Sequence, residues 1–215
     1  MFIRIPSLLF LVVLLAGCSS SPALKAVQDV AQLVAPFGSK ASAGALRLNP
    51  NFQYLRVQID DREAYFALGY QDREPAGTVE VWYSGAGEVL RLRNGRVVGA
   101  TGMNTEWLSV SFEGLPAWDD LKGVTRFVRH RDVSPGYRYG LQESMSIYPI
   151  QPPRQSQLKN LDPFALRWFE EVGPAASGLP TARYAVLIGP GGAQVVYSEL
   201  CLDSVLCFSW QRWHG

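Results

Sequence analysis

The sequence predicts a mainly β protein, an antiparallel meander that forms a sandwich or a partly open barrel and carries a short N-terminal helix. From residue 51 onward, apolar and polar residues alternate in short segments, which is typical of strands with one buried face. Turn signals rich in Gly and Asn separate these segments, for example at Asn94-Gly95 and Gly189-Pro190. Many short strands joined by such turns favour an all-β sandwich or barrel.

Residues 1–17 have the pattern of an export signal. One cation, Arg4, precedes an apolar run that is shorter than the roughly 20 residues needed to span a bilayer. Leu15-Ala16-Gly17-Cys18 then matches the bacterial lipobox, which implies cleavage before Cys18 and a lipid anchor on its sulfur. Because Ser19 and not Asp follows, the analogy with lipoprotein sorting predicts the outer membrane, facing the periplasm. The alternative is an ordinary signal peptide that happens to contain a cysteine.

Residues 18–50 are predicted to form a lipidated tether with a short amphipathic helix. Ser21-Pro22 is a helix start, with Ser as the N-cap and Pro in the first turn. The helix could pack on the folded domain or lie on the bilayer beside the anchor. Its apolar residues recur at helical spacing before Pro36 and Gly38 end it: Leu24, Val27, Ala31 and Val34.

Residues 51–215 are predicted to form a single all-β domain. Residues 162–173 are ambiguous, because Pro163 would suit a helix start, but they are assigned to a strand. Residues 149–163 are rich in Pro and Gln and are predicted to be a long connection. The other expected strands are 52–59, 64–70, 78–84, 89–93, 96–100, 107–112, 124–130, 139–148, 183–189 and 193–200.

The most patterned segment is the hairpin over residues 88–103. Asn94-Gly95 predicts a type I′ turn, because both central residues of that turn need positive φ. The turn sets the register that places Leu90 and Leu92 on the core side. Three cations should then lie on or near the solvated side, as candidate contacts for a glycan or a partner protein: Arg91, Arg93 and Arg96.

The charge balance excludes whole classes of partner. Removal of residues 1–17 takes away one of the 20 basic residues and none of the 19 acidic ones, so the mature chain is formally neutral. A neutral chain argues against nucleic acid, whose binding depends on an excess of cations, and against a polybasic membrane patch.

Two cysteines remain once Cys18 carries lipid. Cys201 and Cys207 form an even pair in an oxidising compartment, which favours a disulfide over the alternative of two buried thiols. A metal site is not expected, because the two thiols lack further nearby ligands and His214 is the only histidine near them.

The sequence carries no recognisable catalytic motif, so no enzyme and no cofactor are predicted. His130 and His214 have no local signature, and no nucleophile elbow, zinc-protease helix or phosphate-binding loop occurs. The acid pairs, such as Glu170-Glu171, consist of adjacent residues, whereas a glycosidase needs two carboxylates facing one sugar bond. A polysaccharide hydrolase is the less favoured alternative.

Aromatic residues are plentiful, with six Trp, nine Tyr and ten Phe. Most should belong to the core. A ring beside the hairpin arginines could instead stack on a sugar while the cations meet an acidic polymer, and Trp82 and Trp107 are the candidates for this contact.

Residues 79–103 resemble the YjbF-type family, whose members are also described as group 4 capsule polysaccharide lipoproteins. A Trp-containing strand, the hairpin and the following turn carry the resemblance, and the lipobox at Cys18 and the overall length fit as well. The matching residues are Glu80, Trp82, Leu92, Arg93, Asn94, Gly95, Arg96, Val97, Val98, Thr101 and Gly102.

The resemblance implies a non-catalytic accessory role in producing or exporting exopolysaccharide or capsule. Members are encoded beside an outer-membrane β-barrel protein and a soluble periplasmic protein, so the resemblance implies these as partners, and an acidic polysaccharide is a further candidate. The alternative is an assembly or stability factor for the outer-membrane barrel protein, without glycan contact.

Overall fold

The computed structural model describes residues 48–213. The expected signal peptide, Cys18 and the expected N-terminal helix lie outside the described residues, as does His214. Across residues 48–213, no helix is both long and apolar enough to cross a bilayer. The helical elements in this range are three short 3-10 turns, η1 (Trp118–Asp120), η2 (Pro163–Ala165) and η3 (Ala175–Ser177).

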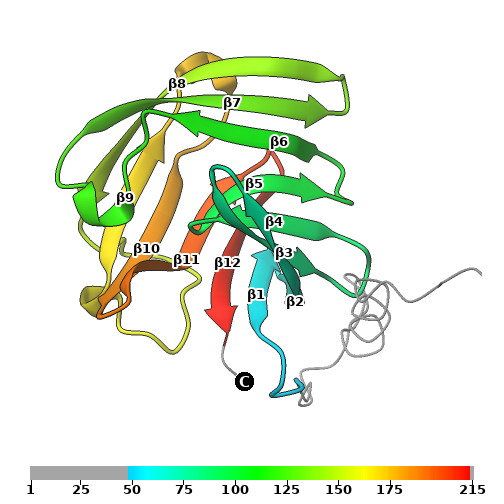
Figure 1. Ribbon diagram of the computed structural model, residues 1–215, viewed down its shortest axis with the longest axis vertical. Coiled ribbons are helices and arrows are strands. Elements are labelled where there is room, and N and C mark those ends of the chain that lie inside the picture. The colour runs from blue at the N-terminus through cyan, green and yellow to red at the C-terminus, as the bar shows by residue number, and fades with distance from the viewer. Residues whose placement is uncertain (1–47, 214–215) are drawn as a thin grey trace, which may run out of the picture.

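Twelve strands form one closed antiparallel barrel in which each strand pairs with its neighbours in sequence (Figure 1). The antiparallel, mainly β prediction is confirmed, but the expected sandwich or partly open barrel is wrong because β12 pairs with β1 and leaves no edge. The strands are β1 (Tyr54–Ile59), β2 (Arg62–Glu74), β3 (Gly77–Tyr83), β4 (Val89–Arg93), β5 (Arg96–Thr101), β6 (Glu106–Glu113), β7 (Thr125–Ser134), β8 (Arg138–Ile150), β9 (Arg167–Val172), β10 (Ala182–Gly189), β11 (Gly192–Cys201) and β12 (Cys207–Trp213).

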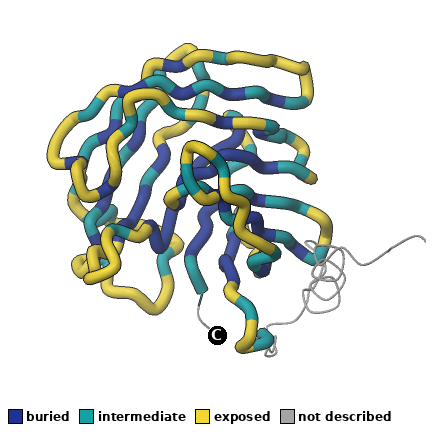
Figure 2. Tube along the Cα trace, in the orientation of Figure 1, coloured by how far each residue is buried: buried dark blue, intermediate teal, exposed yellow. Residues whose placement is uncertain are grey.

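Side chains from every strand contribute to the core, which fills the inside of the barrel. Inward side chains alternate with outward ones, and Figure 2 shows buried positions along the strands with exposed positions in the connections. Among the largest fully buried side chains are Leu55, Phe66, Trp82, Phe169 and Trp210. The interior is therefore packed with side chains over most of its length.

The long connection, residues 151–162, packs on the outer surface of the barrel. Nη1 of Arg56 donates to the carbonyl of Gln157 at 3.0 Å, and the amide of Gln157 donates to the Tyr197 hydroxyl at 2.7 Å. The Gln211 amide group and the backbone of Lys159 exchange hydrogen bonds of 2.9 and 2.7 Å. The polar connection thus buries outward-facing residues of β1, β11 and β12 with their hydrogen bonds satisfied.

The antiparallel order gives the barrel two distinct ends. The turns β2–β3, β4–β5 and β10–β11, together with η1, lie at one end, which we call the mouth end. The turns β1–β2, β3–β4 and β11–β12 lie at the other, the disulfide end, where Cys201 and Cys207 are joined in the expected disulfide. The described chain enters and leaves the barrel at the mouth end.

The β4–β5 hairpin turns into the barrel at the mouth end. Asn94 and Gly95 have φ of 50° and 74°, as the type I′ turn requires, and Leu90 and Leu92 are buried, which confirms the expected register. Gly95 lies so close to β11 that a Cβ on it would meet the Cβ of Val195 at 2.3 Å. Only a glycine satisfies both the turn and this contact.

Gly95→Ala should therefore lower the free energy of unfolding by about 2–5 kcal/mol. Overpacking costs about 1–3 kcal/mol, and a left-handed backbone costs a non-glycine residue about 1–2 kcal/mol more. Gly114→Ala is the matched control, because Gly114 has the same φ of 74° but no atom within 4 Å of its added Cβ. Urea unfolding measures both, and equal losses would contradict the close packing of the turn.

Candidate functional site

The outer face of the hairpin carries two of the three predicted contact arginines. Nη2 of Arg91 donates to Glu74 at 2.8 Å, and Arg93 makes a short contact with the other oxygen of the same carboxylate. The Arg91 side chain is 36% exposed and that of Arg93 only 14%. Both cations are thus near the surface as predicted, but they are already paired with Glu74 from the end of β2.

Arg96 corrects the prediction of one solvated arginine face, because its side chain lies inside the barrel. It is 5% exposed, and its Nη1 donates to the buried Glu171 on β9 at 3.0 Å. Its guanidinium stacks on Trp118 of η1 at 3.8 Å from the ring centroid. Arg96 directly follows the inward-leaning turn, so its side chain reaches a buried carboxylate instead of solvent.

Arg96 belongs to a cluster of five charged side chains inside the barrel. Arg129 and Arg131 on β7 donate to Glu143 on β8 at 2.8 and 2.7 Å, and Arg131 makes a second contact with it at 2.6 Å. Arg129 also lies 3.5 Å from Glu171, which joins the two groups. All five side chains are buried. Three arginines face two glutamates, so the cluster has an excess of one positive charge.

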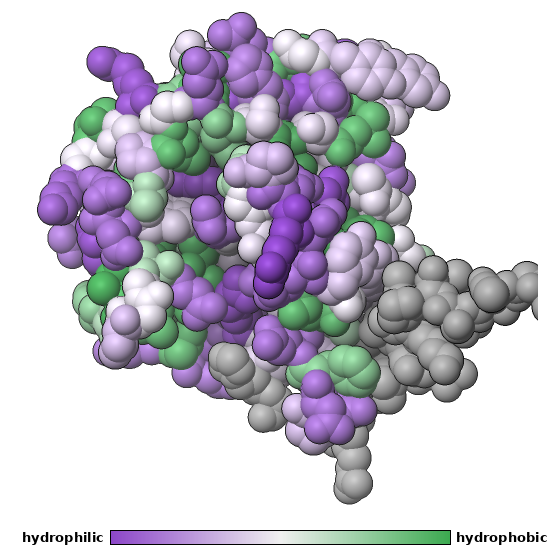
Figure 3. Space-filling view, viewed as in Figure 1, coloured by the Kyte–Doolittle hydropathy of each residue, from purple (hydrophilic) through white to green (hydrophobic). Residues whose placement is uncertain are grey.

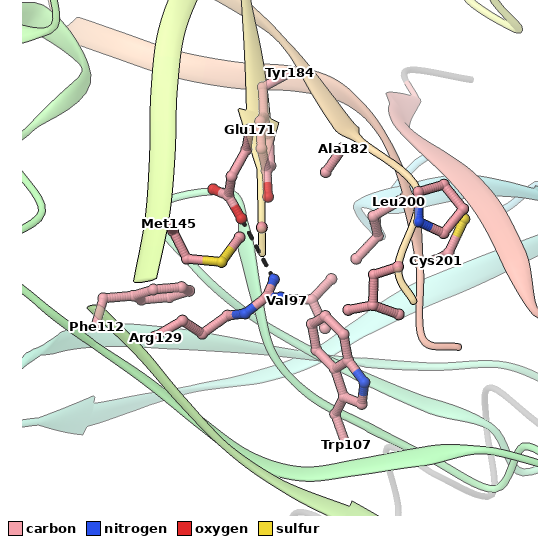
Figure 4. Close-up of a pocket in the computed structure, with 13 residues that line it drawn as sticks. Val97, Trp107, Phe112, Arg129, Met145, Glu171, Ala182, Tyr184, Leu200 and Cys201 are labelled. Atoms are coloured by element: carbon pink, nitrogen blue, oxygen red, sulfur yellow. Dashed lines mark ion pairs between the residues drawn. The ribbon is translucent and has the colours of Figure 1, made fainter. Parts of the chain in front are cut away.

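Two buried atoms of this cluster, Nη2 of Arg96 and Nη2 of Arg129, have no hydrogen-bond partner within residues 48–213. A small cavity of about 20 Å³ adjoins Arg129 and Glu171 and is walled by Trp107, Phe112 and Tyr184, so it has room for about one water molecule (Figure 4). Burial, and then the charge of Glu171, raise the pKa of the Tyr184 hydroxyl, which keeps it neutral. The small volume of this cavity leaves no room for a sugar.

Trp82 and Trp107 also face the interior. They are 1% and 3% exposed, so neither ring can stack on a sugar in this conformation. The Trp107 indole donates to the carbonyl of Leu202 at 2.9 Å, and its ring lies 4.8 Å from the Arg131 guanidinium. These two candidates are therefore core residues, which corrects the expectation of a ring beside a surface groove.

A second and larger cavity, of about 450 Å³, opens at the mouth end. Its volume lies in the range of small-molecule sites, about 300–1,000 Å³. Figure 3 shows a hollow on this face that is bordered largely by hydrophilic side chains. Its polar lining comes from six segments of the barrel: Gln71, Thr78, Glu80, Asn94, Asp119, Gln194 and Arg212. We call this cavity the mouth cavity.

Internal hydrogen bonds hold the charged groups of the mouth cavity in place. Nη2 of Arg212 donates to both oxygens of Glu80, at 3.0 and 2.8 Å, while its Nε donates to the carbonyl of Val195 at 3.1 Å. Asp119 accepts from the amide of Ala193 at 3.2 Å. Trp118 closes the inner side by donating its indole N–H to the carbonyl of Asn94 at 2.8 Å.

His130 and the acid pair Glu170-Glu171, for which no catalytic role is predicted, do not meet in one place. His130 lies on the outside of β7, 3.7 Å from the exposed Glu113. Glu170 accepts from Tyr148 at 2.6 Å on the outer face, while Glu171 points inward, so this adjacent pair does not share a site. Within residues 48–213 no three His, Cys, Asp or Glu side chains are grouped to hold a metal.

The disulfide end is tied together by Asp203 in the loop that the Cys201–Cys207 disulfide closes. Its Oδ1 accepts from the amides of Leu206 and Val205 at 2.6 and 2.7 Å, and these bonds, with one from Thr105, lower its pKa.

The sequence contained a signal for the disulfide but none for the mouth cavity, whose residues come together only when the barrel closes.

No family model matches the chain, and no curated protein matches its sequence. Among solved structures, it is similar to the crystal structure of the hypothetical lipoprotein YmcC from Escherichia coli K12. The identity is 14%, the match covers 75% of this chain and 83% of that chain, and the TM-score is 0.51. At this identity the likeness concerns the fold alone.

Arg96→Gln should lower the free energy of unfolding by about 3–5 kcal/mol, because it leaves Glu171 buried without its closest partner. Arg91→Gln is the matched control on the same hairpin and should cost less than about 1 kcal/mol, as exposed pairs do. Chemical denaturation of both variants tests the assignment, and a neutral Arg96→Gln would contradict a buried ion pair.

Stability should fall in acid through the interior carboxylate of Glu143. Burial acts to raise the pKa of Glu143, but the hydrogen bonds and charges of Arg131 and Arg129 hold it below its ordinary value of 4.5. The folded state therefore favours the carboxylate, so the stabilisation is complete above about pH 4.5 and is lost as the pH falls through the lower, folded-state pKa.

Thermal melts between pH 7 and pH 3 measure this effect. Glu143→Gln should melt lower at neutral pH and show a shallower loss below pH 4.5 than the wild-type protein. Glu113→Gln, at a side chain that is 79% exposed, should keep the wild-type profile. Parallel profiles for Glu143→Gln and the wild type would contradict the role of this carboxylate.

Proposed function

We propose that this chain is a lipid-anchored periplasmic lipoprotein of the outer membrane that acts as a non-catalytic accessory in producing or exporting exopolysaccharide or capsule. Three observations support the proposal. The lipobox ends at Cys18, residues 79–103 resemble the YjbF-type family, and the fold is similar to that of a hypothetical lipoprotein. The partners would be an outer-membrane β-barrel protein and a soluble periplasmic protein of the same system.

The observation that carries the proposal is the position of the family-like segment in the fold. Residues 79–103 supply three lining residues of the mouth cavity, Glu80, Asn94 and Gly95. The residues that resemble a polysaccharide lipoprotein family therefore also shape the mouth cavity. This coincidence favours a role in contacting polymer or partner over a purely architectural role for the hairpin.

A binding role also suits the state of the acids in the cavity. Both oxygens of Glu80 accept hydrogen bonds from Arg212, and Asp119 accepts one from the backbone of Ala193. Carboxylates held in this way position other groups, whereas a glycosidase needs one acid free to give up a proton and another free to act on the sugar or on water.

A second candidate function is assembly of the outer-membrane barrel partner. The β7–β8 hairpin favours it, because Tyr137 and Tyr139 are 74% and 62% exposed there. Aromatic side chains that are exposed in the free protein are often buried at the core of a protein interface once the partner binds. In this case the lipoprotein would support the partner's abundance, and its effect on polymer would be indirect.

Cys18→Ala should abolish both labelling with a palmitate analogue and fractionation with the outer membrane, because it removes the acceptor sulfur. The polysaccharide output of a strain that carries only this variant should fall toward that of a deletion strain. Normal output from the deletion strain would contradict the accessory role. Loss of the barrel partner itself, seen by immunoblot, would favour the second candidate.

A further inference from the structure

We propose that the mouth cavity is a binding site for a neutral sugar unit of the polymer. The choice of a saccharide rests on the proposed function, while the location and the preference for a neutral unit come from the geometry. The cavity is large enough for such a unit, at about 450 Å³, whereas the cavity inside the barrel measures only about 20 Å³. It is also open to solvent at the mouth end (Figure 3).

The charges of the cavity disfavour an acidic sugar. Arg212 is the one cation of the described lining, and its Nη2 donates to both Glu80 oxygens at 3.0 and 2.8 Å. Asp119 adds a further negative charge at the rim. An incoming carboxylate would meet an excess of negative charge and would have to compete with Glu80 for the guanidinium.

The remaining polar groups suit sugar hydroxyls. Gln71, Thr78, Asn94 and Gln194 are exposed, and their side chains make no hydrogen bond within the described part of the chain. Amide and hydroxyl side chains both donate and accept, as sugar hydroxyls do, so they can pair with them in several orientations. These four groups surround the fixed Glu80–Arg212 pair, whose remaining lone pairs and donors add direction.

Ring stacking has little part in this site. Arg96 lies 3.8 Å from the centroid of Trp118, and the rings of Phe169 and Tyr184 lie 5.4 and 5.1 Å from it, so Trp118 is 5% exposed. Recognition therefore rests on hydrogen bonds to the four amide and hydroxyl side chains and to the fixed Glu80–Arg212 pair. A site of this kind selects a monosaccharide unit at a chain end or branch and holds it reversibly.

Ala117→Trp tests the site, because Ala117 is an exposed lining residue whose enlargement would fill the cavity. Ala176→Trp is the matched control, since Ala176 is an exposed residue of η3 at the disulfide end. The full lipidated chain is purified in a detergent without a sugar headgroup. The probes are oligosaccharides from the producing strain's own extracellular polymer, separated into neutral and acidic pools by anion exchange.

Calorimetric titration should show saturable binding of the neutral pool, weaker binding of the acidic pool, and a loss of roughly tenfold or more in affinity for Ala117→Trp alone. Wild-type affinity in Ala117→Trp, or tighter binding of the acidic pool, would overturn the proposal. If Ala117→Trp does not fold, Thr78→Val with Gln194→Ala removes two hydrogen-bonding groups without adding bulk and should weaken binding as well.

The two proposals can fail separately. Absence of binding from both pools overturns the sugar site, but a deletion strain that still loses polymer output keeps the accessory role. Normal output from the deletion strain, together with binding of the neutral pool, overturns the accessory role and keeps the sugar site.

Discussion

The ion pair between Arg96 and Glu171 constrains the rest of the structure, because it places opposite charges inside a barrel that water does not fill. Desolvation of each ion costs several kcal/mol, and only close pairing offsets that cost. The two side chains meet at 3.0 Å from β5 and β9, which are separated in the barrel by three strands. The walls must therefore keep the distance and the register at which this pair forms.

The same pair fixes the position of the mouth cavity. Arg96 stacks on Trp118, and Trp118 donates to the carbonyl of Asn94 at the tip of the hairpin. The tip in turn packs against Val195 through Gly95. Arg96, Trp118 and the turn are thus in contact with one another, and they connect the charged cluster, to which Arg96 belongs, with the mouth cavity, which Trp118 and the turn line.

Much of this fold is predictable from local pattern, since the alternation in most strands and the Asn94-Gly95 turn are properties of the chain itself. Strand β12 is harder to predict, because its aromatic residues are separated by Ser209, Gln211 and Arg212 and it has no β-branched residue. Its pairing with β1 joins residues about 150 positions apart, as in Val57 with Trp210, which no local signal encodes.

The sequence contains a partial signal for the buried charges. The expectation that charged side chains face the solvent gives this signal too little weight. Arg129 and Arg131 alternate in phase with Phe127 and Val133, so β7 places both cations on the core side. Glu143 alternates in phase with Met145 and Ile147 in the same way. For Arg96 no such signal existed, because a residue next to a turn can follow the lean of the turn instead of the alternation of the strand.

The positions of these charged side chains also decide which ligands the surface can bind. Charges that point into the barrel, whether through the alternation of a strand or through the direction of a turn, cannot contact a ligand outside it. The cations expected to meet an acidic polymer are used inside the barrel or paired with Glu74, and Trp82 and Trp107 are enclosed by the core. What remains open at the mouth is a set of uncharged amides and a hydroxyl around a neutralised Arg212, with the negative charge of Asp119 at the rim. The surface that the sequence suggested for acidic sugars is therefore replaced by one whose hydrogen-bonding groups match neutral ones.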